Sequence, residues 1–287
     1  MHANAKSSLE AEKCRVEWGE QQAHALWTNL YARYEPIIDD RVILDLGCSW
    51  GYMLMYLTKH FRPRKTIGVD VVPLWDTVPH GWDYQACLDR VEFHAGLLPE
   101  LDGIQRGSVD YVMCTSVLQY LRPEMILATL ERVYDLLRPG GEMILRTRCF
   151  TSYIGADMHS YYVQDYVHLL HPLNIVRQDL KAWQDRDARY LNYLMASNYM
   201  ALFNQSGLET LDVRRRNNSR SPELIKKVQE TYPWISPDEL LCAEVEARLL
   251  RPIEPDDLNG LGTSQRTNMI IPTEPDEKNL NTQKVDG

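Results

Sequence analysis

The sequence has no long apolar run and no excess of basic residues. Its 287 residues carry 31 Lys and Arg against 40 Asp and Glu, for a formal net charge of −9. Non-specific affinity for nucleic acids comes mainly from Lys and Arg that neutralise phosphates, so this balance argues against a nucleic-acid partner. No segment reaches the about 18 consecutive apolar residues typical of a membrane span. Residues 1–12 are polar and lack the apolar stretch of a secretory signal. We therefore expect a cytoplasmic protein that does not contact a membrane.

Clustered metal-binding residues are also missing. The six cysteines are spread over the chain as Cys14, Cys48, Cys87, Cys114, Cys149 and Cys242. The chain contains neither a Cys-x-x-Cys pair nor the His-Glu-x-x-His sequence of zinc-binding helices. The sequence therefore predicts reduced thiols and no metal ion.

Short apolar runs alternate with helical patterns between residues 41 and 150. The runs have the length and β-branched content of buried strands, and they lie at residues 41–46, 66–70, 90–94, 110–114 and 142–146. Residues 52–61, 74–88 and 123–137 are expected to be helical. Strands that alternate with helices in this way form a parallel sheet covered on both faces, so we predict a doubly wound α/β fold.

The alternation stops at residue 151. Residues 151–190 are rich in Tyr, His, Gln and Asp, which suggests an insertion rather than another strand and helix. A helix over 190–206, a strand over 208–214, a helix that begins near Ser221 and a strand over 241–249 follow. Beyond Arg251 the chain has few large apolar groups, which is typical of a disordered tail.

Two glycines separate the first strand from the first helix. Gly47 and Gly51 lie where a free helix N-terminus and a close backbone approach favour a ligand, although glycines at such turns often serve only the backbone conformation. Three residues separate them, so the G-x-G-x-x-G spacing of pyrophosphate-binding turns is absent. Asp70 ends the next strand, where a carboxylate can bind both ribose hydroxyls of an adenosine ligand or can cap the following helix.

These segments together resemble class I S-adenosylmethionine-dependent methyltransferases, in order and in spacing. The resemblance lies in Ile43-Leu44-Asp45-Leu46-Gly47-Cys48-Ser49-Trp50-Gly51, Ile67-Gly68-Val69-Asp70, residues 109–121, residues 136–142 and residues 203–209. It implies a Rossmann-like, seven-stranded, mostly parallel sheet. The last strand, residues 241–249, is then antiparallel and forms a hairpin with residues 208–214.

The resemblance also implies the cofactor and its binding residues. Asp45, Gly47, Cys48 and Gly51 would surround the methionine part of S-adenosylmethionine, Asp70 would bind the ribose, and Thr115 with Ser116 would line the floor near the sulfonium. One position departs from the family. Many members have an acidic residue for the adenine amine where Leu97 stands, so backbone at Gly96 or Leu97 and apolar packing would replace that contact.

The acceptor side is expected in the insertion after the fifth predicted strand. Transfer to a hydroxyl needs a base, and a histidine titrates near neutral pH. His159 lies just beyond the carboxyl end of that strand, where open α/β sheets place their ligand crevice, so it is the leading candidate base. His168 and His171 are weaker candidates, and Tyr120 is either a second base or an aromatic wall. The tyrosine-rich insertion suits a small organic acceptor, such as a sugar-like or natural-product-like molecule.

The chain is accordingly divided into five parts. Residues 1–40 form a helical lid or a core-packing helix, 41–150 the cofactor-binding core, 151–200 the acceptor-binding insertion, 201–251 the end of the core, and 252–287 a tail. Three alternatives remain open. They are a methyltransferase that acts on a protein or peptide, an inactive module that only binds the cofactor, and a nicotinamide-dependent oxidoreductase.

Overall fold

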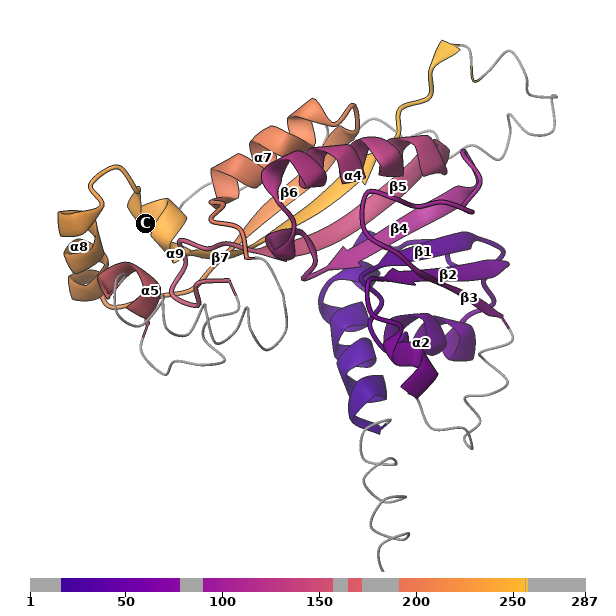
Figure 1. Cartoon of the computed structure of the whole chain (residues 1–287), viewed down its shortest axis with the longest axis horizontal. Coiled ribbons are helices and arrows are strands. Elements are labelled where there is room, and N and C mark those ends of the chain that lie inside the picture. The colour runs from indigo at the N-terminus through magenta and orange to yellow at the C-terminus, as the bar shows by residue number, and fades with distance from the viewer. Residues whose placement is uncertain (1–16, 78–89, 157–164, 172–190, 256, 258–287) are drawn as a thin grey trace, which may run out of the picture. The chain divides into compact units, whose positions relative to one another are not determined.

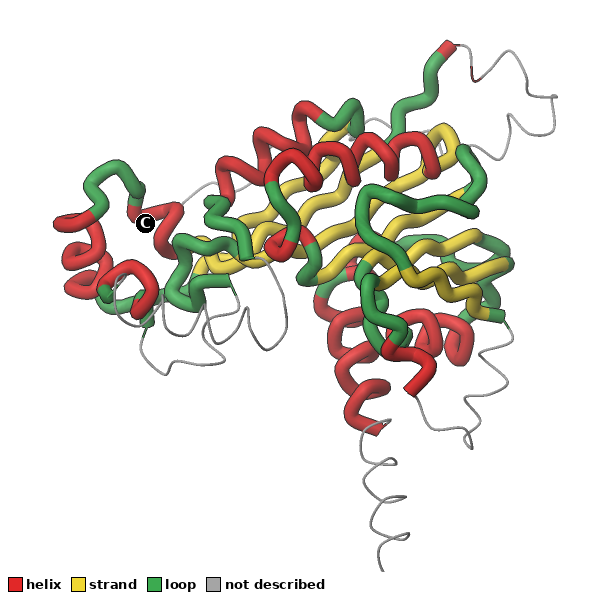
Figure 2. Tube along the Cα trace, viewed as in Figure 1, coloured by secondary structure: helices red, strands yellow, loops and turns green. Residues whose placement is uncertain are grey.

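A seven-stranded mixed sheet organises the chain (Figures 1 and 2). The computed structural model describes residues 17–77, 90–156, 165–171, 191–255 and 257. Met1–Pro252 form one compact unit and Ile253–Gly287 a second, of which the structure describes residues 253–255 and 257. Helices lie on both faces of the sheet in the first unit.

The strand order is β3-β2-β1-β4-β5-β7-β6. The strands are β1 (Val42–Leu46), β2 (Lys65–Asp70), β3 (Val91–Ala95), β4 (Val109–Thr115), β5 (Leu137–Arg148), β6 (Glu209–Asn217) and β7 (Cys242–Leu250). The first five pair in parallel, whereas β7 runs antiparallel to both β5 and β6. This arrangement confirms the predicted Rossmann-like fold and its antiparallel last strand.

Two helical layers cover the central strands. Residues 17–29, the 3-10 helix η1 (Tyr31–Tyr34) and α2 (Tyr52–His60) pack on one face. On the other face lie α4 (Pro123–Leu136), which begins with proline at a helix start, and α7 (Ala196–Gln205). Side chains alternate between the layers as strand geometry requires. Leu44 of β1 joins the α4 and α7 core, and its neighbour Ile43 joins the α2 core.

A third core lies beyond the sheet and combines two segments that are far apart in sequence. Phe150, Tyr166 and Leu169 come from the region after β5, and Val228 and Leu240 come from the connection between β6 and β7. The helices in this core are α5 (Val167–Leu170), α8 (Pro222–Thr231) and α9 (Pro237–Leu241). The insertion therefore does not pack alone, because the β6–β7 connection supplies three of the eight buried residues of this core.

Strand β5 is longer than the sequence predicts. Residues 138–141 fall between the helix expected over 123–137 and the strand expected over 142–146, but they lie inside β5. The pairing shifts from Val109↔Leu137 to Tyr111↔Glu142, and the extra residues form an irregularity in the strand. Of the helical region expected over 74–88, residues 74–77 form the 3-10 helix η2 (Leu74–Thr77) and the rest lies outside the described residues. Within the part of the chain that the structure describes, no helix is long and apolar enough to cross a membrane.

Candidate functional site

The turn after β1 is tied to the end of β2 by backbone hydrogen bonds. The N–H groups of Gly47 and Cys48 both donate to the carbonyl oxygen of Val69, at 2.8 and 3.1 Å. Gly47 has a φ of +73°, and a Cβ atom there would lie 2.2 Å from Cγ2 of Val117. Glycine is required at this position both by conformation and by the lack of space.

Gly51 is required for a similar reason. It begins α2 with a φ of +76°, and an added Cβ atom would lie 2.7 Å from Cζ of Phe93. The ring of Phe93 in β3 also stacks on Trp75, with centroids 4.8 Å apart and an interplanar angle of 10°. Both glycines thus have a structural role in bringing the ends of β1, β2 and β3 together, in addition to any role towards a ligand.

The predicted ribose residue, Asp70, already organises the backbone around it. One carboxylate oxygen accepts the N–H of Ser49 at 2.8 Å, and the other accepts the N–H of Val72 at 3.1 Å. Since each carboxylate oxygen can accept two hydrogen bonds, both keep capacity for a hydroxyl donor. Asp70 therefore links the glycine turn to the loop after β2 and fits the predicted ribose contact.

Asp45 lies on the neighbouring strand and is buried, with 7 % of its surface exposed. Burial, together with the negative charge of Asp70, raises the pKa of the Asp45 carboxyl to about 8. Burial and the same two carboxylates also raise the pKa of the Cys48 thiol well above its usual value, so this cysteine is not a thiolate nucleophile at neutral pH. The turn is therefore a site where negative charge is unfavourable unless a cation is present.

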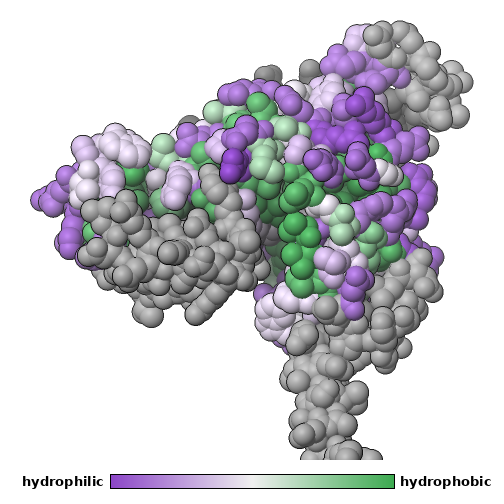
Figure 3. All heavy atoms as spheres, viewed as in Figure 1, coloured by the Kyte–Doolittle hydropathy of each residue, from purple (hydrophilic) through white to green (hydrophobic). Residues whose placement is uncertain are grey.

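Apolar side chains are exposed beside the two carboxylates. Val71, Val72 and Leu97 follow the ends of β2 and β3, and 59 %, 49 % and 57 % of their surfaces are exposed. The N–H of Gly96 donates to the carbonyl oxygen of Asp70 at 3.0 Å and fixes the two loops together. Hydrophobic residues also gather at the centre of the face drawn in Figure 3. An exposed apolar surface of this kind is suited to a flat ring such as adenine.

The predicted floor of the site lies at the end of β4. Thr115 shares a hydrogen bond of 2.6 Å between its Oγ1 and the hydroxyl of Tyr31, and the N–H of Ser116 donates to the carbonyl oxygen of Arg146. Ser116 has a φ of +58°, a conformation that is strained for a residue other than glycine. The assignment of Thr115 and Ser116 to the cofactor site stays a prediction.

Tyr31 was not singled out as a site residue by the sequence. Only 1 % of its surface is exposed, and burial and the nearby Asp45 carboxylate raise the pKa of its hydroxyl well above the usual value. Tyr31 follows Trp27 by four residues, and this helical spacing was the only sequence feature that pointed to it. The spacing indicated a lid or a core-packing helix. The described part of the N-terminal segment packs on α2, where His24 Nδ1 and the Tyr56 hydroxyl lie 3.0 Å apart.

The candidates on the acceptor side are only partly described. His159 lies outside the described residues. Tyr120 ends η3 (Leu118–Tyr120) and packs, partly buried, against the third core, which fits the aromatic-wall interpretation. His168 is buried and donates from Nε2 to the carbonyl oxygen of Phe150 at 2.7 Å, and burial lowers the pKa of its imidazole to about 4. His168 is therefore a neutral core residue.

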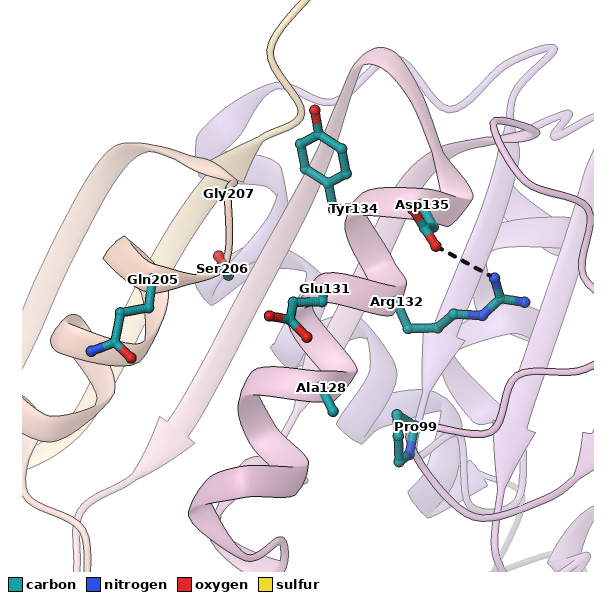
Figure 4. Close-up of a pocket in the computed structure, with 9 residues that line it drawn as sticks. All are labelled: Pro99, Ala128, Glu131, Arg132, Tyr134, Asp135, Gln205, Ser206 and Gly207. Atoms are coloured by element: carbon teal, nitrogen blue, oxygen red, sulfur yellow. Dashed lines mark ion pairs between the residues drawn. The ribbon is translucent and has the colours of Figure 1, made fainter.

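A separate open groove lies on the face of the sheet that α4 and α7 cover (Figure 4). It is bordered by α4 and the end of α7, with Glu131, Tyr134 and Gln205 among its lining residues. An ion pair of 3.9 Å joins Arg132 and Asp135 at its edge. Of the predicted cofactor and catalytic residues that the structure describes, none lines this groove.

The four cysteines that the structure describes, Cys48, Cys114, Cys149 and Cys242, are buried free thiols. Among the described residues, no group of three or more His, Cys, Asp or Glu is arranged to hold a metal ion.

Comparison with known proteins identifies a methyltransferase domain in residues 43–141. The chain is 23 % identical over 146 residues to the U6 snRNA methylphosphate capping enzyme Amus of Drosophila melanogaster, which covers 45 % of this chain and 49 % of that protein. It is 30 % identical over 115 residues to carboxy-S-adenosyl-L-methionine synthase of Vibrio parahaemolyticus, which covers 36 % and 42 %. The chain thus spans about half the length, or less, of these curated relatives.

Solved structures share the fold. An S-adenosylmethionine-dependent methyltransferase from Mesorhizobium loti superposes with a TM-score of 0.51 at 16 % identity, and the match covers 79 % of this chain and 98 % of that one. The match therefore extends well past the end of the methyltransferase domain at residue 141.

Proposed function

We propose that this chain, which belongs to the class I S-adenosylmethionine-dependent methyltransferases, transfers a methyl group from S-adenosylmethionine to a small organic acceptor. When bound, the cofactor supplies an electrophilic methyl group on a positively charged sulfur. Displacement at that carbon depends mainly on holding donor and acceptor in line and on excluding water. The protein's task is therefore chiefly binding and orientation.

The pair formed by the buried Asp45 and the half-buried Asp70 is the observation that carries the proposal. Asp45 and Asp70 lie close enough at the ends of β1 and β2 for the charge of one to raise the pKa of the other. A ligand with an ammonium and a sulfonium group would relieve this repulsion. A dinucleotide would bring a pyrophosphate to the same turn and increase the repulsion, so the pair argues against the nicotinamide alternative.

The remaining contacts follow from the surroundings of the pair. The adenine ring is assigned to the apolar surface of Val71 and Leu97, the ribose hydroxyls to Asp70, and the amino-acid part to Asp45 and the turn from Gly47. The other residues assigned to the cofactor site are Gly47, Cys48, Gly51, Gly96, Thr115 and Ser116.

We infer that the reaction is O-methylation of a sugar-like or natural-product-like acceptor with His159 as the base. The support is positional, since His159 follows the carboxyl end of β5 by eleven residues. Two tyrosines of the region are partly or largely exposed. Tyr193, exposed by 58 %, meets Phe150 edge to face at 4.6 Å, and Arg220 stacks over the Tyr153 ring at 3.5 Å. Tyr166 is not available to contact an acceptor, because it is buried and its hydroxyl donates to the carbonyl oxygen of Leu240.

The testing experiment is titration calorimetry of the purified chain with S-adenosylmethionine, S-adenosylhomocysteine and NAD. We expect micromolar binding of the first two and none of NAD. A labelled-methyl assay over sugar, phenol, peptide and RNA acceptors then identifies the acceptor class. Binding of NAD alone would refute S-adenosylmethionine as the cofactor. Methylation of peptides or RNA alone would refute a small organic acceptor. Binding of S-adenosylmethionine without any methyl transfer would favour the inactive module.

A further inference from the structure

The two loops beside the proposed ribose contact are fixed to each other. Asp70 and Ala95 end β2 and β3 and pair in parallel. The N–H of Gly96 donates to the carbonyl oxygen of Asp70 at 3.0 Å. Further along the loop after β2, the ring of Trp75 stacks on Phe93 of β3, with centroids 4.8 Å apart. Contacts within the chain therefore hold the two loops together.

The side chains that these loops present to solvent beside Asp70 are apolar. Val71 and Val72 follow β2, Leu97 follows β3, and 59 %, 49 % and 57 % of their surfaces are exposed. The base of an adenosine ligand is bonded directly to its ribose, so a ribose bound by Asp70 brings the base to this surface. Covering exposed apolar groups with the face of a flat ring is favourable, because it removes them from water.

The main-chain groups of the two loops are mostly used within the chain. The N–H of Val72 donates to the carboxylate of Asp70 at 3.1 Å, and the carbonyl oxygen of Val72 accepts the N–H of Leu74 at 2.7 Å. The N–H of Gly96 is used as well. The N–H of Leu97, by contrast, forms no hydrogen bond within the part of the chain that the structure describes. This donor suits a ring nitrogen of the base, which is an acceptor, and not an amine.

Recognition of the exocyclic amine of adenine would need a hydrogen-bond acceptor. Residues 71–77 and 96–101 contain two acidic side chains, Asp76 and Glu100, and both are exposed. Among the described residues, neither carboxylate is held by a hydrogen bond or an ion pair. A side chain without such a partner loses conformational entropy when a ligand orders it, so it is not prepared to accept from the amine. The loops thus offer apolar contacts to the base and no fixed carboxylate.

We propose that this site recognises the faces of the base and not its exocyclic amine, and that the chain therefore binds analogues of S-adenosylmethionine that are altered at position 6 of the purine. This inference rests on the proposed function and specifies its cofactor class. A site built to hydrogen-bond a group strongly rejects a ligand that lacks it, because the site's polar groups are left unpaired, whereas an apolar surface discriminates weakly. Leu97 is the residue that sets this weak discrimination.

The test is titration calorimetry of the full chain with S-adenosylhomocysteine and three altered forms of it. One form has hydrogen in place of the amine, a second carries a methyl group on the amine, and the third lacks the ribose 2′-hydroxyl. We expect the first two to bind within about threefold of the parent ligand, since no net hydrogen bond to the amine is lost. The third is the control and should bind about tenfold more weakly or worse, because a hydrogen bond to the Asp70 carboxylate is lost.

A variant that supplies the missing acceptor tests the role of Leu97. Leu97→Asp should bind the deaminated ligand about tenfold more weakly than the parent ligand, because its carboxylate can accept from the amine. The matched control is Ile37→Asp, the same kind of change at an apolar side chain that is 50 % exposed and precedes β1. It should bind the two ligands equally. Comparing two ligands on one variant removes any general effect of the added charge on affinity.

The outcomes separate this inference from the proposed function. A loss of more than about threefold with the deaminated ligand on the unaltered chain would overturn the inference, because it would show that the amine is recognised. The same loss with the methylated ligand would overturn it by showing that the edge of the base is enclosed. A Leu97→Asp variant that does not distinguish the two ligands would refute the role of Leu97. Failure of the unaltered chain to bind S-adenosylhomocysteine itself would instead refute the proposed function.

Discussion

Replacing Asp45 by asparagine tests the central physical claim about the site, that a buried carboxyl is kept at the expense of stability. Burial and Asp70 raise the pKa of Asp45 from 3.8 to about 8. Between these values the folded chain retains a proton that the unfolded chain has lost, so stability falls as pH rises from about 4 to about 8 and changes no further above that. At pH 7 the difference is roughly three pKa units, or about 4 kcal/mol, as an upper figure.

Asp45→Asn keeps the position neutral at every pH, so the variant should escape this loss. We expect its thermal midpoint to exceed that of the unaltered chain by up to about 10 °C at pH 7, and the difference to disappear near pH 4. The measurement is thermal unfolding by circular dichroism from pH 4 to pH 9. Asp102→Asn, the same change at an exposed carboxyl, is the control and should show no such trend.

Binding of S-adenosylmethionine should favour the unaltered chain over the Asp45→Asn variant. Because a cationic ligand favours ionised Asp45, the affinity of the unaltered chain for S-adenosylmethionine should increase as pH rises towards 8, with release of a proton on binding. Asp45→Asn should bind more weakly and lose this pH dependence. The difference in thermal midpoint between Asp45→Asn and the unaltered chain should be larger at pH 7 than at pH 4. An equal difference at the two pH values would refute the reasoning about the carboxyl pair.

Three further results are expected. Asp70→Ala should weaken cofactor binding in calorimetry by about tenfold or more, because charge-assisted hydrogen bonds to the ribose are lost; unchanged affinity would contradict the placement of the ribose. His159→Ala should lower turnover in the labelled-methyl assay and spare S-adenosylhomocysteine affinity, and a full-rate variant would remove this histidine from the mechanism. Tyr31→Phe should lower stability in urea unfolding by about 1 kcal/mol, since Thr115 loses its hydrogen-bond partner; no loss would mean that water replaces the hydroxyl.

The strand pattern was predictable because buried parallel strands have a local signature. Residues 41–46 are short, apolar on both faces and β-branched, and all of β1 is buried in the structure. The bulge that extends β5 back to Leu137 was not predictable, because it depends on the register with β4 and not on the composition of residues 137–141.

The position of the predicted cofactor residues in the fold, though not their role, was predictable for a related reason. They follow the carboxyl ends of consecutive parallel strands, so an order in sequence becomes a row in space. Asp45, Gly47, Asp70 and Thr115 meet in this way at one edge of the sheet. The assignment of the base to His159 and of the acceptor region to residues 151–200 stays a prediction, since most of that region lies outside the described residues.

The sequence by itself determined the α/β fold, the glycine turn and the two carboxylates, because periodicity and strand ends are properties of neighbouring residues. Only the tertiary structure decided which distant groups share an environment. It placed Tyr31 against Thr115, joined α8 and α9 to the insertion in a third core, and brought four arginines from three segments around Glu244 and Glu246. Such contacts depend on how strands and helices pack across the sheet, and no local pattern in the chain encodes that packing.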